Sequence, residues 1–130
     1  MKVLIVDDSM AIRHAISKTV TEMGYEPIEA ENGAEALIKL KSSYQQVVLT
    51  ILDWNMPVMD GMDVLRKVKN TEEYAHIPVL MATSDGIKED VIKALKAGAA
   101  SYLVKPFKSE ELQARIEEIL NAVDASVKSE

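Results

Sequence analysis

Short apolar runs alternate with longer amphipathic segments along the chain. Four of these runs are rich in Val, Ile and Leu and too short to be helices; they span residues 3–6, 47–52, 79–82 and 102–104. Runs of this kind are typical of parallel strands that are buried on both faces. Residues 27–30 begin with a proline and include a glutamate, which predicts a strand at an edge of the sheet.

The segments between the strands repeat apolar residues at intervals of three and four, which predicts amphipathic helices. In the first helix, Ser9 is expected to cap the start and Gly24 to end it. Ser109 and the acidic residues after it predict the start of the last helix. The positions expected to face the core are Ile12, Ile16, Val20 and Met23, then Ala34, Leu37 and Leu40, then Met62, Leu65 and Val68, then Ile87, Val91 and Leu95, and finally Leu112, Ile116, Ile119 and Val123.

Five strands that alternate with five helices predict an α/β fold, a doubly wound parallel sheet with helices on both faces. A length of 130 residues is enough for one domain with its own core and leaves no room for a second one. We expect this domain to span residues 1–123 and residues 124–130 to form a frayed tail.

Composition and charge exclude several classes of protein. With no cysteine, the chain has no disulfide framework, thiolate zinc site or cysteine nucleophile, and a reducing compartment fits it best. The net charge of −6 argues against nucleic-acid binding and favours a cationic partner or a metal ion. No apolar run approaches the roughly 20 residues of a membrane helix, and the first strand meets an acidic pair too soon for a signal peptide. We therefore expect a cytoplasmic protein without membrane insertion.

Chemically reactive residues follow four of the predicted strands. They are Asp7 and Asp8, Asp53, Thr83 and Lys105. Because the carboxyl ends of parallel strands share one edge of the sheet, we expect these side chains to converge there. Crowded carboxylates either hold protons or recruit a cation, and oxygen ligands favour Mg²⁺, Mn²⁺ or Ca²⁺, with Mg²⁺ the first choice. The alternative is that the acidic pair only begins a helix and that the lysine is solvated.

Other kinds of site have no support in the sequence. The chain contains no G-x-x-x-x-G-K-[ST] loop, no G-x-G-x-x-G after the first strand and no G-x-S-x-G elbow. His14 falls within the first predicted helix and His76 in a loop. We expect both histidines to be surface residues rather than ligands or bases.

Four motifs at the strand ends resemble those of the response-regulator receiver family. They are V-L-I-V-D-D-S, D-W-N-M-P-V-M-D-G, P-V-L-M-A-T-S and S-Y-L-V-K-P-F. The resemblance extends from residue 2 to about residue 122 and is strongest to stand-alone chemotaxis regulators of the CheY type. It implies a flavodoxin-like sheet with the strand order 2-1-3-4-5.

The resemblance also implies a role for each reactive residue. Asp53 would be the phosphoacceptor, attacking a phosphorus supplied by a phosphohistidine on a sensor kinase or phosphotransfer domain. The ligands of Mg²⁺ would be Asp7 (through water), Asp8, Asp53 and the backbone carbonyl of Asn55. The phosphoryl oxygens would be contacted by Thr83 and Lys105.

Further implications concern switching and output. Tyr102 would turn inward on phosphorylation and reshape a face formed by the fourth helix, fifth strand and fifth helix, where an output protein such as a flagellar motor switch component binds. From the sequence alone, Tyr102 is equally well a half-buried packing residue. The peptide bond between Lys105 and Pro106 is commonly cis in this family. We expect the unphosphorylated protein to be a monomer.

The leading hypothesis is a phosphorylatable single-domain switch that works in chemotaxis and does not turn over outside substrates. One alternative is a phosphorelay intermediate or phosphate sink outside chemotaxis. A second is a phosphatase similar to the haloacid dehalogenases, but those enzymes usually carry an aspartate two positions after the nucleophile, where this chain has Asn55. A phosphate-independent adaptor is disfavoured because every expected site residue is present.

Overall fold

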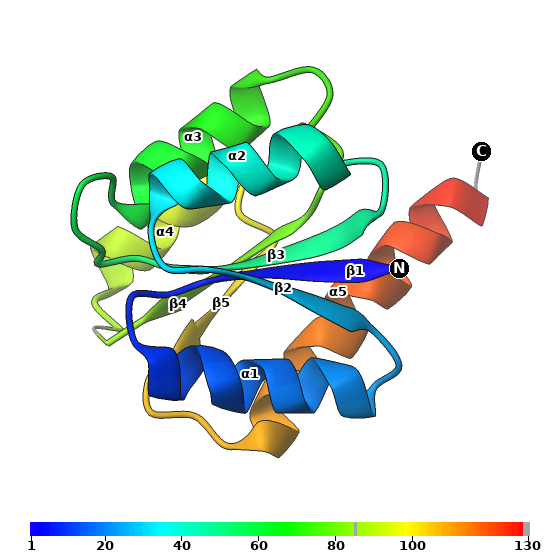
Figure 1. Ribbon diagram of the computed structural model, residues 1–130, viewed down its shortest axis with the longest axis horizontal. Coiled ribbons are helices and arrows are strands. Elements are labelled where there is room, and N and C mark those ends of the chain that lie inside the picture. The colour runs from blue at the N-terminus through cyan, green and yellow to red at the C-terminus, as the bar shows by residue number, and fades with distance from the viewer. Residues whose placement is uncertain (85, 129–130) are drawn as a thin grey trace.

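Five strands and five helices alternate along the chain in the computed structural model, which describes residues 1–84 and 86–128, and side chains as far as residue 124 (Figure 1). The elements are β1 (Lys2–Val6), α1 (Met10–Glu22), β2 (Glu26–Ala30), α2 (Gly33–Ser43), β3 (Val47–Asp53), α3 (Gly61–Asn70), β4 (Val79–Thr83), α4 (Lys88–Lys96), β5 (Ser101–Val104) and α5 (Ser109–Lys128).

The strands form one parallel sheet in the order β2-β1-β3-β4-β5. This confirms the doubly wound, flavodoxin-like fold, and β2 is an edge strand as its proline and glutamate predict. The chain order reverses between β1 and β3, because β2 lies on one side of β1 and all later strands lie on the other. Ligand sites of such sheets lie at the carboxyl ends of the strands near this point.

Helices cover both faces of the sheet and bury a separate apolar core on each (Figure 1). On one face, α1 and α5 pack over the alternate residues of β1 and β3 through Ile16, Val20, Leu112, Ile116 and Ile119. On the other face, α2, α3 and α4 contribute Ala36, Leu40, Met62, Val64, Leu65, Val68 and Ala94. Because the central strands are buried on both sides, their carboxyl ends are held rigidly at one edge.

Most predicted helix ends are confirmed. The Ser9 hydroxyl accepts a hydrogen bond from the Ile12 N–H at 3.3 Å, and Gly24, with φ of +94°, follows the end of α1. Ser109 is the first residue of α5, as the sequence predicts, and its hydroxyl oxygen lies 2.9 Å from that of Thr19. It therefore joins α5 to α1.

Several predicted core assignments are wrong. Ala34 in α2 and Val123 in α5 were expected to face the core, but both are exposed, Val123 to 39%. The run at 102–104 was expected to be buried on both faces, but β5 is the second edge strand and Val104 is 38% exposed.

Ile87, which directly precedes α4, and Leu95 within it were expected in the core; they are 47% and 42% exposed, and Ala94 is fully buried instead. Val91 and Ala94 are the buried residues of α4, and its larger apolar residues Ile92 and Leu95 lie on the outward side.

The helix α5 continues to Lys128, and the expectation of a frayed tail concerns residues 124–130, of which 129 and 130 lie outside the described part of the chain. The domain boundary at residue 123 stays a prediction.

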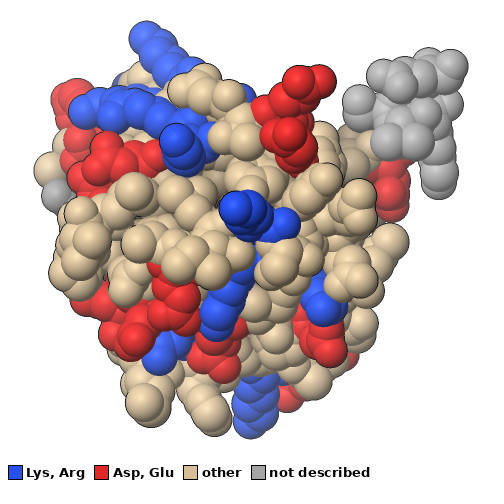
Figure 2. Space-filling model, turned by 45° about the horizontal axis from the view of Figure 1, so that its top comes forward, with Lys and Arg blue, Asp and Glu red and all other residues tan. Residues whose placement is uncertain are grey.

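Within the described residues, no helix has the length and apolar character that crossing a bilayer requires. On the face shown in Figure 2, basic and acidic side chains are interspersed, without a continuous basic stripe.

Candidate functional site

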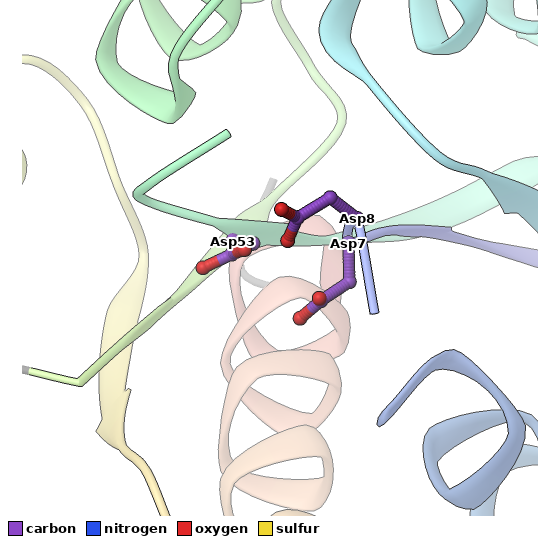
Figure 3. A group of neighbouring side chains, drawn as sticks. All are labelled: Asp7, Asp8 and Asp53. Atoms are coloured by element: carbon purple, nitrogen blue, oxygen red, sulfur yellow. The ribbon is translucent and has the colours of Figure 1, made fainter. Parts of the chain in front are cut away.

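Three carboxylates meet at the carboxyl ends of β1 and β3, neighbouring strands in the sheet. Asp7 and Asp8 directly follow β1, and Asp53 is the last residue of β3. One oxygen atom of each lies within 4.8 Å of those of the other two, and Figure 3 shows the side chains turned toward a shared space. Asp7 and Asp53 are 1% and 4% exposed, whereas Asp8 is exposed. The sequence prediction that these acids converge is thus matched by the geometry.

Lys105, which follows β5, connects the two buried acids. Its Nζ donates to Asp7 Oδ2 at 2.8 Å and to Asp53 Oδ1 at 3.1 Å. Burial, the largest single influence, lowers the pKa of Lys105, but the hydrogen bonds and charges of the two carboxylates together raise it above its ordinary value. The lysine is therefore charged at neutral pH, and three carboxylates still outnumber it.

Asp53 is harder to ionise than an ordinary aspartate. Burial raises its pKa from 3.8 to about 6, against the effect of the hydrogen bond from Lys105. The charge of Asp7 also raises this pKa, and the charge of Lys105 and a backbone hydrogen bond from Asn55 lower it. At neutral pH the carboxylate is mostly ionised yet poorly solvated, which suits a nucleophile.

The loop between β3 and α3 fixes the backbone that carries Asp53. The Trp54 N–H donates to the carbonyl of Ala82 at 2.9 Å, and the Trp54 carbonyl accepts from the Gly61 N–H at 2.7 Å. A Cβ atom on Gly61 would lie 2.3 Å from the backbone oxygen of Asp53, so only glycine allows this approach. The pocket beside the acids is lined by Asp8, Asn55, Met56, Pro57 and Asp60.

Thr83 lies at the same edge of the sheet as the acids. It is the buried last residue of β4, one strand beyond Asp53, and its backbone oxygen accepts from the Lys105 N–H at 2.7 Å. The peptide bond from Lys105 to Pro106 is cis. The ends of β4 and β5 are thus held side by side, with the lysine directed at the acids.

Tyr102 is separate from the acid cluster. It pairs in register with Met81, two residues before the end of β4, and it packs partly buried against the core under α2, α3 and α4. The guanidinium carbon of Arg115 in α5 lies 6.0 Å from the centroid of its ring. The tyrosine therefore stands between the core and the surface formed by β5 and α5.

Arg13 is a residue of the site that the sequence analysis missed. It is 9% exposed; its Nη1 donates to the backbone oxygen of Asp7 at 2.7 Å, and its Nε to Glu29 Oε1 at 3.3 Å. The signal was available in the sequence, because Arg13 falls on the apolar face of α1, three positions before Ile16. A charged residue in such a stripe requires a buried partner.

The donor set of the cluster fits a hard divalent cation. All three acids offer carboxylate oxygens, the ligands that Mg²⁺ prefers, and solvent-exposed Asp8 leaves access for the ion's waters. His14 and His76 are exposed on α1 and in the loop before β4, as expected, and do not lie among these three acids. The residues present therefore suit magnesium better than a softer metal.

The sequence model of the family described as response regulator receiver domain matches residues 3–117 of this chain, and these residues include all four strand-end motifs. The chain therefore belongs to the response regulator receiver family. This confirms the resemblance found in the sequence, and it identifies the chain as a signalling domain whose family uses Mg²⁺ at the acidic site.

Individual relatives narrow the class to CheY-like chemotaxis response regulators. The chain is 45% identical to chemotaxis protein CheY1 of Helicobacter pylori over 125 residues, 95% of this chain and 100% of that protein. The structure of Vibrio cholerae CheY4 is similar with a TM-score of 0.85 and 37% identity, covering 91% of this chain and 97% of that one. A CheX-CheY-BeF₃-Mg²⁺ complex from Borrelia burgdorferi contains a chain with a TM-score of 0.87 and 30% identity, covering 92% and 89%.

Proposed function

We propose that this protein is a cytoplasmic, single-domain switch that accepts a phosphoryl group on Asp53 and thereby controls the binding of an output protein in chemotaxis. The phosphoryl donor is a phosphohistidine of a sensor kinase or phosphotransfer domain. The output partner is a flagellar motor switch component. One observation carries the proposal: a buried, desolvated carboxylate, Asp53, that contacts Lys105 and stands among two further acids at a sheet edge.

In the proposed transfer, an Asp53 carboxylate oxygen forms a bond to phosphorus as the bond from phosphorus to the imidazole nitrogen breaks. The bonding electron pair leaves with the imidazole. Asp8, Asp53, the Asn55 carbonyl and, through water, Asp7 would hold Mg²⁺, which would supply positive charge to neutralise the phosphoryl group. Lys105 and Thr83 contact the phosphoryl oxygens, as a point charge and a hydroxyl donor. Catalysis here is positioning and charge neutralisation.

The role of a switch rather than an enzyme or a phosphate sink is supported by two features. Asn55 stands where a phosphatase of the haloacid dehalogenase type usually has its acid. Apolar side chains at the start of α4, on α4 and on β5 are exposed, and a partner can cover them: Ile87, Ile92, Leu95 and Val104. Tyr102 lies between this surface and the core, so its inward turn would couple the site to the face formed by α4, β5 and α5.

The phosphoacceptor is tested with acetyl phosphate and Mg²⁺. We expect intact-protein mass spectrometry to show the addition of one phosphoryl group to the wild type and none to Asp53→Asn. Asp63→Asn, which changes an exposed carboxylate of α3, is the matched control and should be labelled as the wild type is. Labelling of Asp53→Asn at the wild-type level would contradict the proposal.

A further inference from the structure

Arg13 contacts the peptide group that joins Asp7 to Asp8. Its carbonyl oxygen accepts the 2.7 Å hydrogen bond from Arg13 Nη1, and this bond is buried. The Asp7 side chain is restrained separately, by the Ser9 N–H at 2.9 Å and by Lys105. Asp8 follows directly and is exposed, so the orientation of this peptide plane determines where its carboxylate starts.

Arg13 is itself anchored at both ends. Its Cα belongs to α1, whose next turns are packed in the core through Ile16 and Val20. Its Nε donates to Glu29 on β2, and the β2 backbone accepts the Asp7 N–H at Ala30, 3.1 Å away. The guanidinium therefore ties the end of β1 to a helix and to the neighbouring strand. A planar fork with several donors suits this task better than a lysine.

From these contacts we propose that Arg13 is a positioning residue for the metal site, which fixes the Asp7–Asp8 peptide so that both carboxylates face one ion. The inference rests on the proposed function, because it takes the acid cluster to be the Mg²⁺ site. The proposal adds to the metal site a residue, Arg13, that supports the acids without contacting the ion or the phosphoryl group. Such supporting residues typically change metal affinity by 10- to 100-fold when they are lost.

The sign of the effect separates positioning from simple electrostatics. Arg13 is a cation near an anionic site, so removing its charge alone strengthens Mg²⁺ binding. Loss of a positioning contact weakens Mg²⁺ binding, since the two acids then adopt the binding geometry only part of the time. A variant that lacks the guanidinium therefore gives opposite results under the two explanations.

The test measures the Mg²⁺ dissociation constant by isothermal titration calorimetry and by the fluorescence of Trp54, the only tryptophan, which directly follows Asp53. Arg13→Met keeps much of the apolar length and removes both donors; we expect its dissociation constant to rise on the order of 10-fold. Arg13→Gln should weaken binding in the same direction and replaces the first variant if that one does not fold. Arg13→Lys keeps the charge and one donor and should fall between these variants and the wild type.

Controls make each outcome decisive. Ile16→Val weakens the packing of the same helix without touching Asp7 and should leave Mg²⁺ binding unchanged. Unchanged or tighter binding in a folded Arg13→Met or Arg13→Gln protein overturns the role of Arg13 alone. A wild type that binds no Mg²⁺ overturns the proposed function instead, before any variant is compared.

Discussion

Asp53 ionises at an energetic cost that the fold imposes. Its pKa of about 6 in the folded protein lies above the 3.8 of an ordinary aspartate, chiefly because the side chain is buried. Between about pH 4 and pH 6 the folded state therefore holds its proton more tightly than the unfolded state does. The free energy of unfolding that this residue contributes falls as pH rises through this window, the opposite of the usual behaviour of a salt-bridged aspartate.

This sign predicts a stabilising substitution at the acceptor. Without Mg²⁺, Asp53→Asn should be more stable than the wild type at pH 7.5 by on the order of 1–3 kcal/mol, and the difference should fade below pH 4. Urea unfolding in EDTA between pH 4 and pH 8 measures it. Glu73→Gln, which alters an exposed carboxylate before β4, serves as the control and should show no such gain. A destabilised Asp53→Asn at pH 7.5 would contradict this account.

Individual residues also show what a sequence pattern can and cannot supply. Asp7, Asp53 and Lys105 were predictable as neighbours, because strand ends of a parallel sheet share an edge. The contact of Arg13 with the Asp7 carbonyl was not, since it depends on how α1 packs against β1 and on where the guanidinium finds acceptors. A stripe of apolar residues indicates which face of a helix is buried. It does not indicate which group pairs with a charged residue, such as Arg13, on that face.

At the scale of elements, the start of α3 and the end of β3 depend on one another through Gly61. The helix begins so close to the Asp53 carbonyl that a methyl group at position 61 would overlap it, with 2.8 Å to Trp54 Cα as well. Backbone atoms cannot move aside as a flexible side chain can. The packing of one helix terminus therefore sets the position of the acceptor.

We expect Gly61→Ala to destabilise the fold by about 1–3 kcal/mol and to slow labelling by acetyl phosphate, because α3 or Asp53 must move. Gly24→Ala is the matched comparison: φ there is +94°, but beyond the two neighbouring residues in the chain no atom lies within 4 Å of the added carbon. It should cost stability through backbone strain, yet leave labelling unchanged. Unfolding curves and labelling rates of both variants test this, and equal labelling rates would show that Gly61 has no influence on the site.

Predictions from the sequence were most accurate where an element is buried on both sides. The strands β1, β3 and β4 and the caps of α1 agreed with the pattern, since apolar runs and capping residues act locally. The pattern failed for β5 and α4 at the edge of the fold. There an apolar residue such as Leu95 is compatible with core and with partner-binding surface, and only the position of the element decides between them.

The whole molecule places its acid site and its exposed apolar surface on different elements. The acids stand at the ends of β1 and β3, whereas Ile92 and Leu95 project from α4 at 40% and 42% exposure. Since neither residue belongs to the site or to a buried core, changing them should affect binding of a partner without affecting phosphorylation. The surface proposed to bind the partner is thus distinct from the site proposed to be phosphorylated.

We therefore expect Ile92→Ser and Leu95→Ser to retain wild-type melting temperatures and labelling by acetyl phosphate. Each should weaken binding of the phosphorylated protein to a flagellar motor switch component by about tenfold, the equivalent of about 1.4 kcal/mol of apolar contact. Ile38→Ser on α2, 70% exposed in the structure, is the control and should bind normally. Normal binding by both α4 variants would exclude this surface as the output face.

The distance along the chain between the site's members has a consequence for synthesis of the protein. Lys105 lies 98 residues after Asp7 and 52 after Asp53. The first strand to be made, β1, lies in the interior of the sheet and can pair fully only after β2 and β3 have been made. Lys105 is made only after β5. The full set of charges thus assembles only when the last strand docks. A nascent or truncated copy without β5 lacks that set, so competence to accept a phosphoryl group requires that all five strands have been made and have joined the sheet.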